Sequence, residues 1–379
     1  MKIIIAGDLV PTKSNEELFK DKDFFKKLDT EFQNIWNSAD YRIFNLECPL
    51  GVNLTAIDKN GAKLLATSST IEGIKSLNPN LVLLANNHIL DYDIEGLDST
   101  INLLNKYDIQ YTGVIDNTKT KNDTYFIQAE NKKIGIYNLC ENEFSVATNN
   151  SKGANPLDEI KNYKEIKEAK DSCDYLVVVF HGGKEFYRYP SPNLQRICRN
   201  FVDFGADLVI TQHSHCIGCK EEYNKGTIIY GQGNFIFDCG INDEYWKTSL
   251  LITLDINSDI EKIDYIPIEK ENNLIKISND SKIIEDFLAR TDEIKDNEKF
   301  IKDEYNKFSR QHLNNYLNIM NKRRFYKRIL NRLFNREYFV KTYKKEDCLN
   351  ILNIIECEAH RELLITGLKE RIKGTKHES

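Results

Sequence analysis

The chain has 379 residues, 29% of them charged, and a formal net charge of -6. This length predicts one large domain with a smaller appendage, and the mildly acidic balance argues against nucleic acid as a partner. Nine cysteines without dense spacing exclude a disulfide framework. Because the apolar run at the N-terminus is short and no stretch could cross a bilayer, we expect a cytoplasmic protein without a signal peptide or transmembrane segment.

Five strand-like apolar runs each end in residues that can bind a metal. Residues 2–6 lead to Asp8, 41–44 to Asn45 and Glu47, 81–85 to Asn87 and His88, 175–180 to His181, and 208–210 to His213 and His215. Amphipathic helical stretches such as 95–104 and 192–204 lie between the runs, which indicates an α/β fold with buried strands. Sites in open α/β sheets collect at the carboxyl ends of strands, so these side chains are expected to converge.

The pattern changes after His215. Alternating runs at 227–230, 233–238, 249–256 and 263–268 predict the strands of a second sheet, and we place the end of this domain near residue 275. From residue 283 onward strand signals vanish and apolar residues recur at helical spacing. Residues 1–275 are therefore the predicted catalytic domain, and 283–379 a helical appendage.

The residue types at the strand ends suit a hydrolytic metal centre, which needs carboxylates and imidazoles as ligands. His213 and His215 are one residue apart, which in an extended segment places both on the same side. Any single histidine is more often an ordinary core or surface residue. However, four of the seven histidines follow strand-like runs, together with Asp8 and Glu47, and this combination favours a metal site.

The ordered segments resemble the capsule-synthesis proteins of the poly-γ-glutamate (CapA-like) family, a branch of the calcineurin-like metallophosphatases. The resemblance covers about residues 1–270 and rests on Gly7-Asp8, Asn45–Leu50, Ala85–Asp91, His181–Phe186, His213-Ser214-His215 and Gly233-Asn234-Phe235. It implies a four-layer α/β/β/α sandwich with a site for two divalent metals between the sheets.

The resemblance also implies a role for each site residue. Asp8 and His215 would hold the first metal, Glu47 would bridge, and Asn87, His181 and His213 would hold the second. His88 would protonate the leaving group during in-line attack of a polarised water, and Asp91 could hold the ring of His88; the alternative for Asp91 is a helix N-terminal acid. Val10 stands where the superfamily usually has a histidine, so we expect the first metal to bind weakly.

Four further residues are candidates for substrate binding, each with a plainer alternative. Asn45 could orient Glu47 or contact substrate, or be a turn residue. Lys59 could receive an anionic substrate, or be a solvated lysine. Glu143, in the segment Glu141-Asn142-Glu143, could rim the pocket or belong to an ordinary polar loop. Glu185 could lie near the pocket or form a surface salt bridge.

The segment 322–345 carries ten Lys or Arg residues and one acid. As a basic amphipathic helix it could contact an anionic membrane surface or an acidic polymer; alternatively, it packs on the protein with a solvated basic face.

The expected function is a metal-dependent hydrolase, phosphoesterase-like, that acts on an anionic small molecule or polymer in capsule or cell-surface polymer biosynthesis. Two alternatives remain open. The protein could be a non-catalytic accessory that binds metal and polymer, or it could hydrolyse or transfer at a γ-glutamyl amide. An unliganded His88 beside the metals favours catalysis. Mn, Fe, Zn and Co all suit the ligands, in one or two sites.

Overall fold

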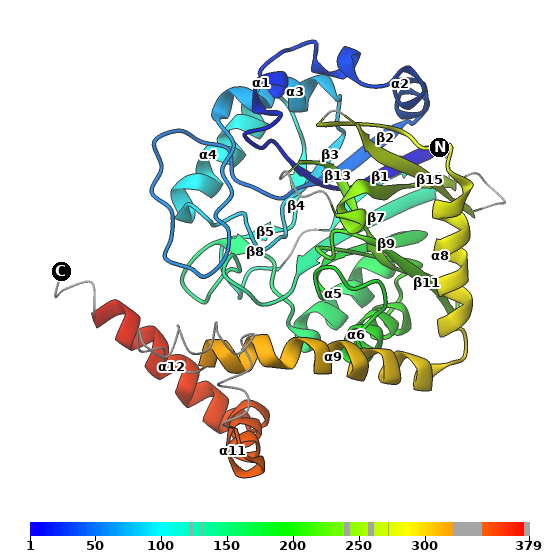
Figure 1. Cartoon of the computed structure of the whole chain (residues 1–379). Helices are drawn as coiled ribbons and strands as arrows, with labels where there is room; N and C mark the ends of the chain where they lie inside the picture. Colours follow the sequence, from blue (N-terminus) through cyan, green and yellow to red (C-terminus); the bar gives the residue numbers. More distant parts are fainter. Residues whose placement is uncertain are drawn as a thin grey trace. The chain divides into compact units, whose positions relative to one another are not determined.

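The computed structural model describes residues 1–121, 124–129, 132–238, 243–256, 261–271, 273–320 and 343–374. The chain folds into two compact units, Met1–Lys302 and Asp303–Ser379. The first unit contains two β-sheets that face one another, with helices on their outer sides (Figure 1).

The first sheet has eight strands around a parallel centre. The strand order is β16-β15-β14-β1-β2-β3-β4, and β13 also pairs with β1. The bounds are β1 (Lys2–Val10), β2 (Tyr41–Leu46), β3 (Leu81–Leu83), β4 (Tyr111–Thr112), β13 (Asn234–Phe237), β14 (Thr248–Ile256), β15 (Glu261–Glu271) and β16 (Leu274–Ile277). Strands β1 to β4 are parallel, and β14 continues the sheet in the antiparallel direction.

The second sheet has six strands in the order β11-β12-β10-β9-β7-β6, and its four central strands are parallel. The bounds are β6 (Tyr125–Ala129), β7 (Lys132–Cys140), β9 (Tyr175–His181), β10 (Leu208–Gln212), β11 (Ile217–Tyr223) and β12 (Gly226–Gln232). A small two-stranded sheet pairs β5 (Val114–Ile115) with β8 (Gly153–Ala154).

Three apolar layers hold the first unit together. Ile3 and Ile5 of β1 face the space between the sheets, where they meet residues of the second sheet such as Val177. Ile4 points the opposite way, toward the helices that cover the first sheet, as the two-residue period of a strand requires. On the far side, Phe180 of β9 packs under the helices that cover the second sheet. Helix, sheet, sheet and helix form four layers, and the predicted α/β/β/α sandwich is confirmed.

Two helices of the first unit, α4 and α6, match the amphipathic stretches predicted at 95–104 and 192–204. The helix bounds in this unit are α1 (Glu16–Phe19), η1 (Phe24–Lys27), α2 (Thr30–Asn37), η2 (Ser68–Thr70), α3 (Ile71–Ser76), α4 (Asp93–Lys106), α5 (Glu159–Lys170), α6 (Pro192–Asp203), α7 (Glu244–Lys247) and α8 (Ser281–Ile294). Helices α2 to α4 contribute to the core of the first sheet, and α5 and α6 to that of the second.

The first unit extends beyond the boundary near residue 275 that the sequence suggested. Helix α8 contacts β11 and β15, and its Phe287 is fully buried with its ring centroid 5.0 Å from that of Tyr265. Helix α9 (Glu298–Met320) begins in the same unit, where Ile301 joins the core of the second sheet. Because these side chains are buried against the sheets, the helices up to Lys302 belong with them.

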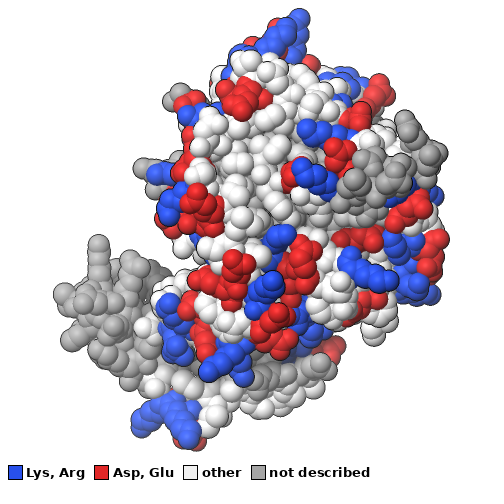
Figure 2. All heavy atoms as spheres, turned by 90° about the vertical axis from the view of Figure 1, so that its right-hand side faces the viewer, with Lys and Arg blue, Asp and Glu red and all other residues white. Residues whose placement is uncertain are grey.

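Charges of both signs are interspersed on the face of the molecule that Figure 2 shows. Among the surface ion pairs of the first unit, Lys262 contacts Asp264 on β15, and Lys282 contacts Asp286 on α8. Alternating signs leave that face without an extended region of one charge.

The second unit contains the rest of α9, α11 (Lys345–Glu356) and α12 (Glu358–Gly374). The predicted helical appendage is confirmed for these residues, while positions 322–342 of the basic segment lie outside the described residues. Helices α11 and α12 contact each other and expose apolar side chains such as Leu352 and Leu363. Within the described part of the chain, no helix combines the length and hydropathy that crossing a bilayer requires.

Candidate metal centre

The ends of four strands bring side chains that could bind a metal together between the two sheets. Asp8 lies near the end of β1 and Glu47 directly follows β2, whereas His181 ends β9 and His213 directly follows β10. Strands β1 and β2 are adjacent and parallel, as are β9 and β10. Their carboxyl ends therefore lie side by side, and all four side chains are buried.

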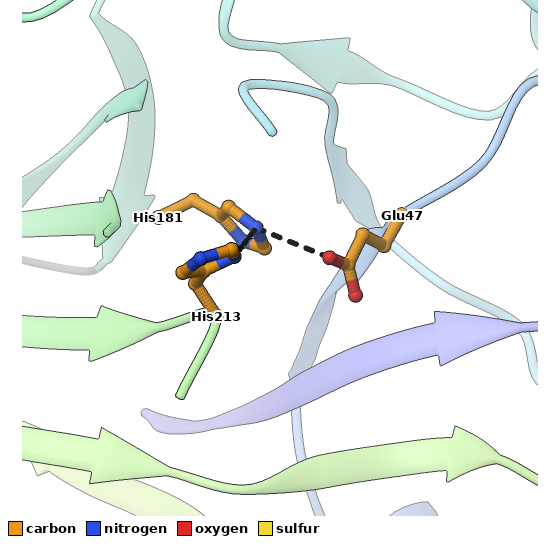
Figure 3. Close-up of side chains that lie close together, drawn as sticks. All are labelled: Glu47, His181 and His213. Carbon is orange, nitrogen blue, oxygen red and sulfur yellow. Dashed lines mark hydrogen bonds and ion pairs between the residues drawn. The ribbon is translucent and has the colours of Figure 1, made fainter. Parts of the chain in front are cut away.

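One group of possible ligands, the His181 group, consists of Glu47, His181 and His213. One ligand atom of each residue lies within 4.8 Å of the others, and the side chains point toward one another (Figure 3). Nε2 of His181 is 3.2 Å from Oε1 of Glu47 and 3.2 Å from Nδ1 of His213. This set of one carboxylate and two imidazoles suits a divalent cation of the first transition row.

A second group, the His215 group, consists of Asp8, Glu47 and His215, whose ligand atoms also lie within 4.8 Å of one another. Nδ1 of His215 is 3.9 Å from Oδ2 of Asp8 and 2.9 Å from Oδ1 of Asn234, which begins β13. Glu47 belongs to both groups, which is the position that a bridging ligand occupies in a two-metal site.

Glu47 also gives an independent indication of a cation. Its side chain is fully buried, and its oxygens have no hydrogen-bond partner beyond the ion pair of Oε1 with Nε2 of His181 at 3.2 Å. A buried carboxylate oxygen without a donor is costly, and the neighbouring imidazoles offer further ligand atoms for a cation that would compensate the charge of Glu47. The residues present therefore fit the divalent cations that the sequence implies.

The predicted amide residues lie directly beside these groups. Oδ1 of Asn87 is 3.1 Å from Nε2 of His181, close enough to contribute to the His181 group. Asn45 is fully buried and donates a hydrogen bond from Nδ2 to Oδ1 of Asp8 at 2.7 Å. Asn86 holds Asn45 in turn, at 3.1 Å. Asn45 is thus held by Asn86 and fixes the position of the Asp8 carboxylate.

The pKa values of the ligands follow from their burial and mutual contacts. Burial alone would lower the pKa of His181, but the carboxylates of Glu47 and Asp8 outweigh it and raise that pKa to about 10. Burial would raise the pKa of Asp8, but its contacts with His181 and His215 lower it. Burial and the charges of His181 and His215 hold the pKa of His213 well below its usual value. Without a cation, His181 therefore carries the positive charge of the site.

The backbone at the histidine pair is unusual. His213 and His215 have φ angles of 79° and 54°, in the left-handed region that disfavours side chains with a Cβ. Such residues cost about 1–3 kcal/mol each, and persist where their surroundings fix them. The His213 N–H donates to Oδ2 of Asp8 at 3.3 Å, which fixes part of this turn. The left-handed residues keep His213 and His215 in their two groups.

His88 stands apart from both ligand groups, as predicted. Its Nδ1 donates a hydrogen bond of 2.6 Å to Oδ2 of Asp91, which is fully buried. This contact orients the ring and leaves Nε2 as the nitrogen available to a substrate. Lys59 forms an ion pair with Oδ1 of Asp91, and its side chain is only 2% exposed. Lys59 is therefore engaged with Asp91 and is not the solvated lysine that the sequence offered as the plainer alternative.

The acidic residues predicted at the pocket rim differ from those that the structure brings close. Glu143 is exposed, and Glu185 forms a surface ion pair of 3.6 Å with Lys184. Glu141 is the residue of this set that reaches the centre: its Oε1 is 3.4 Å from Nε2 of His213. Its Oε2 accepts a hydrogen bond from Gly183 N–H at 3.1 Å, and burial raises its pKa. Its place directly after β7 is the sequence signal that could have singled it out.

The sequence pattern of the bacterial capsule synthesis protein PGA_cap family matches residues 2–239. The chain belongs to this family. The match ends just after β13 and thus includes every residue of the two ligand groups, together with His88 and Asp91. The predicted resemblance to CapA-like capsule-synthesis proteins is confirmed.

Two Bacillus relatives are similar over part of their length. The capsule biosynthesis protein CapA of Bacillus anthracis is 29% identical over 54% of this chain and 52% of its own. The PGA biosynthesis protein CapA of Bacillus subtilis is 28% identical over 62% of this chain and 63% of its own. The chain thus matches between half and two thirds of the length of these curated relatives.

More distant similarities include a probable polyglutamine synthesis accessory protein of Mycobacterium tuberculosis, 21% identical over 53% of this chain and 56% of its own. Among solved structures, a hypothetical protein of Thermus thermophilus has 10% identity and a TM-score of 0.43, over 72% of this chain and 100% of that one. Chaetomium thermophilum Vps29 has 9% identity and a TM-score of 0.32, over 73% and 96%.

Proposed function

We propose that this protein is a divalent-metal-dependent hydrolase of the phosphoesterase type, acting on an anionic substrate in capsule or cell-surface polymer synthesis. The observation that carries the proposal is the position of Glu47, which is fully buried and belongs to both ligand groups. A shared carboxylate between two imidazole-containing groups is the ligand arrangement of two-metal hydrolases.

Asp8 and His215 would hold one cation, His181, His213 and Asn87 the other, and Glu47 would bind both. When bound, the cations would supply Lewis-acid polarisation of the substrate and of the attacking water. Asn45 orients Asp8 through its hydrogen bond of 2.7 Å. His88 would donate a proton from Nε2 to the leaving group, while Asp91 holds the opposite ring nitrogen.

A specific observation keeps an accessory role as the second candidate. The Mycobacterium tuberculosis relative is named a probable polyglutamine synthesis accessory protein, which fits a protein that binds metal and polymer without turnover. The position of His88 favours catalysis, because a binding protein has no need of an imidazole outside the ligand groups. A γ-glutamyl amide substrate would use the same ligands and differs in the bond that is broken.

The deciding experiment measures Mn²⁺-dependent hydrolysis of phenyl phosphate, 4-nitrophenyl phosphate and bis(4-nitrophenyl) phosphate by the wild type and His88→Ala. We expect turnover that requires the cation. On phenyl phosphate, whose leaving group needs a proton, kcat should be about 100- to 10,000-fold lower in His88→Ala, with the cation still bound, whereas the 4-nitrophenyl esters should lose much less. His312→Ala, which changes a histidine on α9, is the matched control and should behave as wild type. Full cation occupancy without turnover of any of these esters would refute the phosphoesterase and leave the accessory role and the amide reaction.

A further inference from the structure

One irregular loop folds around Asp91. It connects Glu47 with η2, and three of its residues contact Asp91. The N–H of Ile57 donates to the backbone oxygen of Asp91 at 2.9 Å, and the N–H of Leu64 donates to Oδ2 at 2.6 Å. Nζ of Lys59 forms an ion pair with Oδ1. The loop that follows the shared residue Glu47 therefore also contacts the carboxylate that holds His88.

The pair of Lys59 and Asp91 is buried, with side chains 2% and 0% exposed. The ring of Phe144 lies over Lys59, with Nζ 5.3 Å from its centroid. Two buried charges of opposite sign compensate each other, and removal of one leaves the other uncompensated. Asp91 would therefore change its position or its surroundings if Lys59 were neutral.

The contacts of Lys59 also bear on which of the two ring nitrogens of His88 carries a proton. Nζ of Lys59 is 3.3 Å from Nδ1 of His88, and an ammonium has hydrogens but no lone pair. Lys59 could therefore donate a hydrogen bond to Nδ1 only if Nδ1 carried no proton. The shorter contact, 2.6 Å from Nδ1 to Asp91, requires a proton on Nδ1. Because Lys59 pairs with Asp91, the carboxylate remains in place to accept that proton, and Nε2 is directed to the substrate.

We propose that Lys59 is a positioning residue for proton transfer by His88, acting through Asp91. The sequence alone suggested that Lys59 receives the anionic substrate; a buried ion pair assigns it to the orientation of the proton donor instead. This inference rests on the proposed function. Its consequence is specific: loss of Lys59 impairs the hydrolysis of esters whose leaving group needs a proton, and spares esters whose leaving group does not.

The kinetic test compares phenyl phosphate, which has a poor leaving group, with 4-nitrophenyl phosphate, which has a good one, in the Mn²⁺-loaded full chain. For Lys59→Met we expect kcat on phenyl phosphate to fall about 10- to 100-fold, and on 4-nitrophenyl phosphate less than about threefold, with KM unchanged. Lys59→Arg should restore most of the activity. The control Lys170→Met removes a lysine that pairs with Asp207 at 2.7 Å on the helical side of the second sheet, and should change neither.

Two kinetic results would overturn the proposal. A raised KM with unchanged kcat would mean that Lys59 receives the substrate, and an equal loss on both esters would mean that it only supports the fold.

A second measurement needs no turnover. In ¹⁵N-labelled protein, the Nδ1–H signal of His88, identified by its loss in His88→Ala, should be protected in the wild type and broadened or lost in Lys59→Met. An unchanged signal would overturn the proposal even if neither ester were hydrolysed, and that failure of hydrolysis would count against the proposed function alone.

Discussion

The two ligand groups share Glu47 but differ in what surrounds them. Polar neighbours support the His181 group: Asn87 lies 3.1 Å from His181, and Glu141 lies 3.4 Å from His213. The His215 group has polar partners in Asn45 and Asn234, and it also borders an aromatic ring: that of Trp246 lies 4.5 Å from that of His215. The groups differ in their ligand atoms, because the His181 group offers two imidazoles and the nearby Asn87, whereas the His215 group offers one imidazole. This difference indicates that a cation in the His181 group is the more tightly held.

The largest expected effect comes from the residue that the groups share. Glu47→Gln should lose both cations and lower hydrolysis by more than about 1,000-fold, because a neutral amide cannot compensate two divalent charges. Metal content after Mn²⁺ loading and desalting, measured by mass spectrometry, checks this. Glu165→Gln is the matched control: Glu165 is also buried, but it accepts a hydrogen bond from Tyr137 in a separate network. Two retained cations in Glu47→Gln would contradict a bridging role.

The second-largest effect distinguishes the cation affinities of the two ligand groups. His215→Ala should lose the weaker cation and retain one per chain, whereas His181→Ala should weaken the tighter cation by about 100-fold or more. Calorimetric titration of the metal-free variants with Mn²⁺ measures both stoichiometry and affinity. Equal losses in the two variants would show that the groups do not differ in affinity.

A smaller effect is the release of a proton when the cation binds. The raised pKa of His181, about 10, keeps it protonated in the metal-free protein near neutral pH, while a ligand must be neutral. Cation binding should therefore release about one proton per chain between pH 7 and 8.5. Calorimetry in two buffers of different ionisation enthalpy measures this release, and its persistence in His181→Ala would assign it to another group.

The same shift predicts how the metal-free fold responds to pH. Because the folded pKa of His181 lies above its usual value of 6.5, protonation of His181 stabilises the fold fully below that pH. The contribution is lost as pH rises toward 10. The melting temperature of the metal-free protein should fall over that range, more than that of His181→Ala.

The smallest effect tests the rim of the centre. Glu141→Gln should lower kcat about 3- to 10-fold, because Glu141 lies beside His213 without replacing a ligand. Glu143→Gln should change nothing, since Glu143 is exposed. If Glu143→Gln had the larger effect, Glu143 would be the acidic residue at the rim, as the sequence predicted.

The sandwich and most of the centre could be predicted from the sequence because strands carry their own signal. Apolar runs such as those that end at Asp8 and His181 define buried strands, and the carboxyl ends of parallel neighbours meet by geometry. Both ligand groups consist of such residues.

The remaining features depend on contacts without a sequence period. Lys59 lies in an irregular loop, so its pairing with Asp91 could not be read from spacing. The choice between Glu141 and Glu143 depends on which side chain turns inward after β7. Helix α8 resembled the helices of the appendage in pattern, and the burial of Phe287 against the sheets assigns it to the first unit.

The position of the centre between the sheets has a further consequence for heat tolerance. Asp8 and Glu47 come from the first sheet and His181 and His213 from the second, while the sheets otherwise meet through the apolar layer that contains Ile3 and Val177. A cation held by Glu47 and His181 would therefore join the two halves of the sandwich. At a free concentration of about 100 times its Kd, one such cation adds about 2.7 kcal/mol to the free energy of unfolding. When the metal is scarce, the folded protein would lose this stabilisation as well as the cation that the proposed reaction requires.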